Sequence, residues 1–256
     1  MTAREFIEKK KRKERIAMLT AYDALFARML EEAGIDAILV GDSVGNVFQG
    51  RSSTREVTLK DMCYHTEAVA RGIKDVLLIA DLPIGTYDTI DEALRSAKSL
   101  TEAGAQAVKL EGNPQGIVKG LCDHGFSVMG HLGLLPQTAV DFKVKGKDAQ
   151  DAERIVQDAI SVADAGAFSI VLECLPEKLS QRITSEVPVP TIGIGAGKYC
   201  DGQVLVIHDM LGITPGNKLK FVKRYADLSS AIHQAVSSYV QEVKDGSFPA
   251  NEHTFH

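Results

Sequence analysis

Short apolar runs alternate with longer amphipathic stretches along most of the chain. The runs predict strands at residues 16–19, 36–41, 76–80, 106–110, 126–130, 168–172, 190–194 and 204–207. Each run is short and bounded, which is typical of a parallel strand that is buried on both faces. Helical patterns fill most of the intervals, so the chain is predicted to alternate strands with helices.

Four segments repeat one arrangement, in which a helix end is followed by a glycine, an apolar strand and an acid. They are EEAGIDAILVGD (31–42), ARGIKDVLLIAD (70–81), TEAGAQAVKLE (101–111) and ADAGAFSIVLE (163–173). The glycine comes where a left-handed residue usually ends a helix, at Gly34, Gly72, Gly104 and Gly166. The repetition predicts a strand–helix unit that occurs several times.

About eight parallel strands with intervening helices in 256 residues match an α/β fold of the (β/α)₈ TIM-barrel type. A doubly wound open sheet is the alternative. Residues 1–15 are expected to form an N-terminal helix before the first strand. The segment GAGKYCDGQ (195–203) is too short for a full crossover helix, so we expect a stunted connection between strands 7 and 8.

The composition has no shift or linker that would divide the chain. We therefore expect a single barrel domain over residues 1–256, with residues 247–256 as a loose tail. The formal net charge of −5 gives no electrostatic reason to expect nucleic acid. The basic run at residues 9–15 is more typical of a solvated helix face than of a nucleic-acid patch.

Cysteine usage and hydropathy indicate the compartment. The four cysteines include no CxxC pair, so neither a zinc site nor a disulfide framework is indicated. The N-terminal segment MTAREFIEKKKRKER lacks the apolar core of a signal peptide, and no later run has the length of a membrane span. A cytoplasmic protein without a membrane partner is predicted.

The carboxyl ends of the strands carry most of the candidate chemistry, as is usual in such barrels. These ends hold Asp42, Asp81, Glu111, His131, Glu173 and His208. A single acid after a strand more often caps a helix or solvates a loop, but four acids in equivalent positions favour a shared site. Lys109 is two residues from Glu111, so both side chains are expected to enter the same cavity.

Converging carboxylates repel one another in a low-dielectric site unless a cation compensates them. Lys109 and a bound ion would both do so. Aspartate and glutamate oxygens favour a hard ion, Mg²⁺ before Mn²⁺ or Ca²⁺. The sequence therefore predicts a magnesium site at the mouth of the barrel.

Two glycine-rich stretches follow strands. Residues 129–147 are long for such a connection and suit a lid over a site, with His131 within it expected to be a loop hydrogen-bonding residue. GIGAG (193–197) is equally consistent with a phosphate-binding loop and with a tight turn.

Several motifs occur together in one order along the chain. They are GDS (41–43), Asp81, KLEG (109–112), GHLGLLPQ (130–137), LEC (172–174) and GIGAG (193–197). With these motifs the sequence resembles the ketopantoate hydroxymethyltransferase family. The resemblance extends from TAYD (20–23) through DGQVLVIHD (201–209), and only the basic N-terminal arm and the tail lie outside it.

That resemblance implies a hydroxymethyl transfer from 5,10-methylenetetrahydrofolate to 3-methyl-2-oxobutanoate. The product would be 2-dehydropantoate, a precursor of pantothenate and coenzyme A. It also implies a large homo-oligomer, a decamer of two stacked rings. No motif in the chain identifies the residues that would contact the folate.

The resemblance also assigns roles to individual residues. Asp42 and Asp81 would hold Mg²⁺, with Glu111 completing or orienting its shell. The oxo acid would be contacted by Asp42, Ser43, Asp81 and Lys109. Glu173 would be the catalytic proton acceptor.

Two other functions stay open on the sequence. The same barrel and metal would also suit a carbon–carbon lyase or phosphonate chemistry on an oxo acid. A catalytically silent barrel that binds a metabolite or serves as a scaffold is the other alternative. Release of tetrahydrofolate in the presence of 3-methyl-2-oxobutanoate would distinguish transfer from cleavage.

Overall fold

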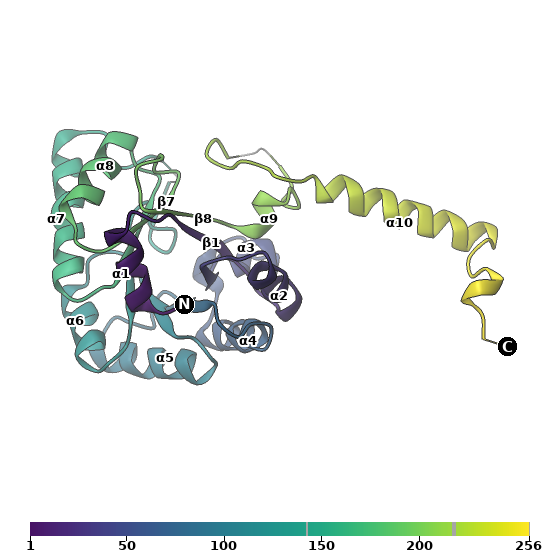
Figure 1. The fold of residues 1–256 in the computed structure, drawn as a ribbon, viewed down its shortest axis with the longest axis horizontal. Coiled ribbons are helices and arrows are strands. Elements are labelled where there is room, and N and C mark those ends of the chain that lie inside the picture. Colours follow the sequence, from purple (N-terminus) through teal and green to yellow (C-terminus); the bar gives the residue numbers. More distant parts are fainter. Residues whose placement is uncertain (142, 217–218, 256) are drawn as a thin grey trace. The chain divides into compact units, whose positions relative to one another are not determined.

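The structure, a computed structural model, describes residues 1–141, 143–216 and 219–255. The chain forms two compact units, Met1–Val206 and Ile207–His256 (Figure 1). Each unit has its own architecture. The expectation of a single domain over residues 1–256 stays a prediction.

The first unit is a closed barrel of parallel strands in the order β1 to β8, in which β1 pairs with both β2 and β8. The strands are β1 (Ile16–Thr20), β2 (Ala37–Val40), β3 (Leu77–Asp81), β4 (Ala107–Lys109), β5 (Val128–Gly133), β6 (Ser169–Glu173), β7 (Thr191–Ile194) and β8 (Gly202–Leu205). The (β/α)₈ barrel is confirmed, and the open sheet is excluded. Six strands agree with expectation to within one residue at each end, whereas β5 extends to Gly133 and β8 begins at Gly202.

Helices surround this barrel (Figure 1). They are α1 (Ala3–Lys11), α2 (Ala24–Glu32), α3 (Val44–Val47), the 3₁₀ turn η1 (Thr54–Glu56), α4 (Leu59–Ala70), α5 (Ile90–Glu102), α6 (Gln115–Asp123), α7 (Ala149–Asp164) and α8 (Glu177–Glu186). Capping boxes begin α4 at Thr58 and α5 at Thr89. The described residues 195–201 between β7 and β8 contain no helix, which confirms the stunted connection.

All four repeated glycines follow the end of a helix, and three of them are left-handed. Gly34, Gly104 and Gly166 have φ values of +84°, +110° and +106°, as the repeat predicts. Gly72 does not adopt a positive φ. A Cβ there would lie 2.3 Å from the carbonyl oxygen of Ala24, so close backbone approach requires this glycine.

The GIGAG segment contains the last two residues of β7 and the bend that follows it. Gly195 and Gly197 have φ values of +65° and +79°. A Cβ on Gly197 would lie 2.6 Å from the Cγ of Glu177, at the start of α8. Chain geometry therefore accounts for these two glycines.

Helix α1 closes the amino-terminal end of the barrel. The ring of Phe6 is fully buried and meets the ring of Phe168 edge to face, with centroids 5.7 Å apart. Phe6 belongs to an apolar cluster with residues at the beginnings of the strands, including Ile16 and Ala37. The N-terminal helix is thus part of the barrel core.

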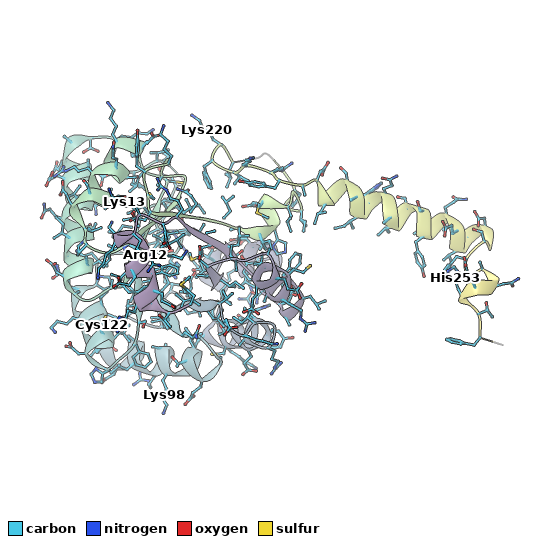
Figure 2. The ribbon with its side chains drawn as sticks, in the orientation of Figure 1. Arg12, Lys13, Lys98, Cys122, Lys220 and His253 are labelled. Carbon is cyan, nitrogen blue, oxygen red and sulfur yellow. The ribbon has the colours of Figure 1, made fainter. Side chains whose placement is uncertain are left out.

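The basic run of α1 has two roles. Arg12 and Lys13, which follow the helix, are exposed (Figure 2). Lys9 and Lys10 instead pair with Asp36 and Asp201, each at 2.9 Å. The predicted solvated face is therefore limited to part of the run, because two lysines attach α1 to acids that precede β2 and β8.

Phe6→Ala is expected to lower the free energy of unfolding by about 3–5 kcal/mol, because it removes a buried ring and leaves a cavity. Urea unfolding followed by circular dichroism measures this change. Phe255→Ala is the control, since the Phe255 side chain is exposed. A loss below about 1 kcal/mol would mean that α1 contributes little to the core.

The second unit contains α9 (Ile207–Met210), α10 (Leu228–Asp245) and the 3₁₀ turn η2 (Asn251–His253). His208 lies on α9, not at the end of a strand. Helix α10 has no buried residue in the structure. The Phe248 ring meets the Tyr239 ring at 5.7 Å, and the loose tail at 247–256 stays a prediction.

No helix in the described part of the chain has the length and apolar character of a membrane span.

Candidate active site

A cavity of about 120 Å³ opens at the carboxyl ends of the barrel strands. All the site residues predicted from the sequence line it, namely Asp42, Ser43, Asp81, Lys109, Glu111 and Glu173. His131 lines it as well. Parallel strands of a closed barrel present their last residues to one mouth, which explains why residues far apart in sequence meet here.

Asp42 and Asp81 form a buried pair at the ends of β2 and β3. The backbone N–H of Asp42 donates to Oδ2 of Asp81 at 3.0 Å, and both residues are at most 5% exposed. Burial and the adjacent Asp81 carboxylate raise the pKa of Asp42 to about 7. Gly41 leaves room for the side chain of Ser43, because a Cβ there would lie 2.9 Å from Oγ of Ser43.

Lys109, the last residue of β4, supplies positive charge to this pair. Its Nζ lies 2.8 Å from Oδ1 of Asp81. Burial opposes the charged form, but the carboxylates of Asp81, Glu111 and Asp42 outweigh it and raise the pKa of Lys109. The lysine is therefore a permanent cation, and its nearest acidic partner in the structure is Asp81.

His131 connects two further carboxylates. Its Nδ1 lies 3.4 Å from Oε1 of Glu111, and its Nε2 lies 3.1 Å from Oε2 of Glu173. Burial and the Lys109 ammonium lower the pKa of His131, but the hydrogen bonds to Glu111 and Glu173 outweigh them and raise it to about 9. The two ring nitrogens of His131 therefore face the two glutamates.

The position of His131 corrects the expectation that it is a loop hydrogen-bonding residue. It lies within strand β5 and is 3% exposed. The apolar run that predicted this strand ended at residue 130, since the glycines and the histidine beyond it are not apolar. Backbone pairing with β6 continues the strand through Gly133.

Glu173 is the last residue of β6, and its side chain is 15% exposed. The next residue, Cys174, has a φ of +50°, which is uncommon for a residue other than glycine. The chain therefore turns away from the strand directly after Glu173. This leaves the carboxylate on the cavity wall, with His131 as its neighbour.

The model of the ketopantoate hydroxymethyltransferase family matches residues 1–251. The chain belongs to the ketopantoate hydroxymethyltransferase family. It is 50% identical over 255 residues to the 3-methyl-2-oxobutanoate hydroxymethyltransferase of Syntrophomonas wolfei subsp. wolfei, a match that covers 97% of this chain and 92% of the relative. Like these relatives, it is a transferase.

Solved structures with little sequence identity share the barrel. The phosphoenolpyruvate phosphomutase of Streptomyces platensis subsp. rosaceus superposes with a TM-score of 0.66 at 15% identity, covering 96% of this chain and 88% of that one. A 2,3-dimethylmalate lyase of the PEP mutase/isocitrate lyase superfamily gives 0.63 at 17%, covering 100% and 92%. At such identity the likeness shows the fold alone.

Two residues of the site in this family member were not predicted from the sequence. The hydroxyl of Tyr22 lies 2.8 Å from Oγ of Ser43 and holds that side chain in place. Gln137 donates from Nε2 to Oδ2 of Asp42 at 2.9 Å, and its backbone N–H donates to Oε2 of Glu111 at 3.0 Å. Both lie within motifs noted above, TAYD and GHLGLLPQ, but uncharged residues gave no chemical signal.

The charges of the site fit a divalent cation. Four carboxylates, those of Asp42, Asp81, Glu111 and Glu173, face one lysine and one histidine in a buried space. Such an excess of negative charge is costly without a cation, and carboxylate oxygens are the donors that Mg²⁺ prefers. Among the described residues no group of three such side chains is already gathered for an ion, so the ligand set stays a prediction.

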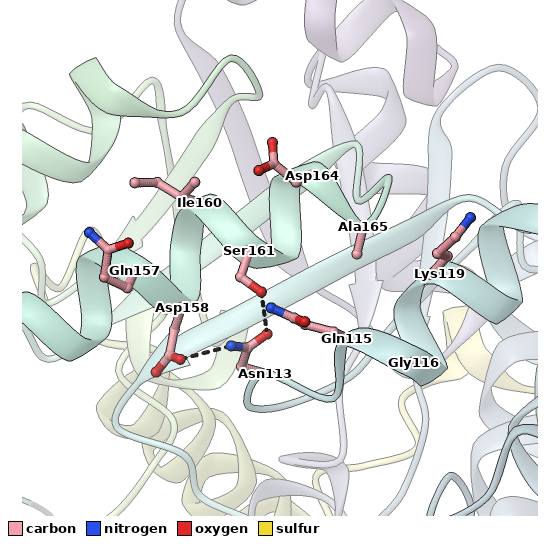
Figure 3. A pocket seen from close by; sticks show the side chains of 10 residues that line it. All are labelled: Asn113, Gln115, Gly116, Lys119, Gln157, Asp158, Ile160, Ser161, Asp164 and Ala165. Atoms are coloured by element: carbon pink, nitrogen blue, oxygen red, sulfur yellow. Dashed lines mark hydrogen bonds between the residues drawn. The ribbon is translucent and has the colours of Figure 1, made fainter.

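A second hollow, of about 730 Å³, lies outside the barrel between α6 and α7 (Figure 3). Asn113 there donates to Oδ1 of Asp158 at 2.8 Å and accepts a hydrogen bond from Ser161 at 3.2 Å (Figure 3). These polar side chains are hydrogen-bonded to one another in an open groove. The cavity at the strand ends, with its buried titratable groups, is the candidate active site of this family member.

Proposed function

We propose that the barrel transfers a hydroxymethyl group from 5,10-methylenetetrahydrofolate to 3-methyl-2-oxobutanoate and forms 2-dehydropantoate, in pantothenate and coenzyme A biosynthesis. The observation that supports the proposal is the arrangement of charged side chains in the cavity. A carboxylate pair with a lysine lies beside a separate glutamate, Glu173, whose Oε2 is 3.1 Å from Nε2 of His131. The lysine and the carboxylate pair would bind an anionic oxo acid, and the separate glutamate would act as the base.

The size of the cavity supports a small oxo acid as the substrate that enters it. Its 120 Å³ is well below the roughly 300–1,000 Å³ of pockets that enclose drug-sized ligands. Asp42, Ser43, Asp81 and Lys109 would contact the oxo acid. Lys109 is the cation that offsets the charge of the substrate carboxylate, while Ser43 offers a hydroxyl that Tyr22 orients.

Asp42 and Asp81 would hold Mg²⁺, with Glu111 completing or orienting the shell. When bound, the ion would supply Lewis-acid stabilisation of the charge that develops on the oxo oxygen, a contribution of several kcal/mol.

Glu173 would take the proton from C3 of the oxo acid. His131 keeps its carboxylate oriented and balances its charge. The electron pair left at C3 would form the new bond to the methylene carbon, and both bonds from that carbon to the folate nitrogens would break. Water would supply the hydroxyl group on the same carbon. The second proton of the water and the proton taken from C3 would end on the two nitrogens, so that tetrahydrofolate leaves. Because the cavity is too small for a pterin, the folate would lie over its mouth, under the segment that follows β5.

Three further features belong to this proposal. The enzyme would be cytoplasmic and would act on these two small molecules without nucleic acid or membrane. It would assemble as a homo-oligomer, with a decamer as the predicted form. Sedimentation velocity would measure the assembly.

The decisive experiment supplies the purified protein with 3-methyl-2-oxobutanoate, 5,10-methylenetetrahydrofolate and Mg²⁺. Formation of 2-dehydropantoate together with tetrahydrofolate is expected, and chelation should stop both until Mg²⁺ is restored. Cleavage of an oxo acid without folate would instead favour a lyase. Full turnover by metal-free protein would contradict the assigned metal.

A further inference from the structure

The segment 134–141, which follows β5, directs one polar side chain into the barrel. Within the described residues 135–141, Gln137 is buried at 1% exposure, whereas Val140 is fully exposed. The carbonyl oxygen of Leu135 accepts hydrogen bonds from the N–H groups of Thr138 and Ala139 at 3.1 and 2.8 Å. The segment is therefore a compact turn with its glutamine directed inward.

Every polar group of Gln137 has a partner. Its Nε2 donates to Oδ2 of Asp42 at 2.9 Å and to the carbonyl oxygen of Leu82 at 3.0 Å. Its Oε1 accepts a hydrogen bond from the hydroxyl of Tyr87. Its backbone N–H donates to Oε2 of Glu111 at 3.0 Å. One residue thus contacts two of the carboxylates at the mouth and the connections after β3 and β4.

A second set of bonds holds the same turn from outside. The Nε of Arg55, on η1 after β2, donates to the carbonyl oxygen of Gln137 at 2.9 Å. The guanidinium also donates to the carbonyl oxygen of Ala139. Arg55 does not line the cavity, so it acts on the turn and not on the carboxylates.

We propose that Gln137 is a positioning residue that fixes the carboxylate of Asp42 and makes its orientation depend on closure of the 134–141 turn over the cavity. The proposal rests on the proposed function for the role of Asp42. A rotated Asp42 would no longer present its second oxygen to the cavity. An opened turn would remove the Gln137 amide from Asp42. Closure of the turn and substrate binding would therefore be coupled.

Gln137→Met tests the proposal because it keeps the length of the side chain and removes both amide groups. Affinity for 3-methyl-2-oxobutanoate in the presence of Mg²⁺, measured by calorimetry, is expected to fall about 10- to 100-fold, as for other residues that orient ligating groups. Amides in residues 134–141 should exchange with deuterium faster. Gln106→Met is the matched control, since Gln106 accepts a hydrogen bond from Leu78 N–H at the opposite end of the barrel.

Arg55→Met is the second variant, and it keeps the test usable if Gln137→Met folds poorly. It should speed exchange in residues 134–141 and weaken oxo-acid binding although Arg55 does not line the cavity. Faster exchange with unchanged affinity in Arg55→Met would overturn the coupling. Unchanged exchange and affinity in Gln137→Met would overturn the positioning role. Exchange is read without substrate, so the failure of wild-type protein to bind the oxo acid would count against the proposed function and not against the closure of the turn.

Discussion

Glu173→Gln is expected to slow exchange of the C3 proton of 3-methyl-2-oxobutanoate with deuterated water by about 10²- to 10⁴-fold, the usual cost of losing a positioned general base. The amide keeps the size of the side chain and its contact with His131, whose Nε2 lies 3.1 Å from the carboxylate. It lacks the basic oxygen. Proton NMR of the oxo acid with Mg²⁺ present measures this step without the folate.

Two observations accompany that measurement. Glu177→Gln is the control, because Glu177 is an exposed glutamate that begins α8, just after the same strand. Affinity for Mg²⁺ and for the oxo acid should change little in Glu173→Gln. Exchange at the wild-type rate would show that Glu173 is not the base and would make His131 the next candidate, whereas lost metal binding would make Glu173 a ligand.

Asp42→Asn is expected to have opposite effects on stability and on ion binding. At a pH above 7 Asp42 is mostly ionised beside Asp81, and the neutral amide removes this buried repulsion. The metal-free variant should therefore be more stable than wild type, by about 0.5–2 kcal/mol. It should also lose most of the stabilisation by Mg²⁺, which for wild type is about 2.7 kcal/mol at 100 times the dissociation constant.

Thermal unfolding with and without Mg²⁺ measures both effects. Asp36→Asn is the matched control at the other end of β2. It loses an ion pair of 2.9 Å with Lys9, so it should lower stability and leave the response to Mg²⁺ unchanged. A metal-free Asp42→Asn protein that is less stable than wild type would mean that the Asp42 carboxylate stabilises the fold. An unchanged response to Mg²⁺ would remove Asp42 from the ligand set.

The repeated strand–helix pattern was sufficient to predict the barrel, because the apolar runs and the glycines after helices are local signals. Where the signal was not local, the prediction was less accurate. Strand β5 continues through Gly133 because its backbone pairs with β6, although a histidine and glycines interrupt its apolar run. Gly72 was expected to end a helix by a positive φ, but the proximity of the Ala24 backbone explains it, and only packing creates that proximity.

For the site, the sequence by itself determined which acids reach the mouth of the barrel, together with Lys109, because the end of a parallel strand is readable from its apolar run. It misplaced His208, which lies on α9. Only the tertiary structure decided how these residues pair. Lys109 meets Asp81 because β3 and β4 are neighbours, and His131 meets Glu173 because β5 and β6 are neighbours. Gln137 reaches Asp42 from 95 residues away because a turn after β5 folds back over the mouth. Such contacts depend on strand register and on how a loop folds back. Neither can be predicted from the local sequence around an uncharged glutamine.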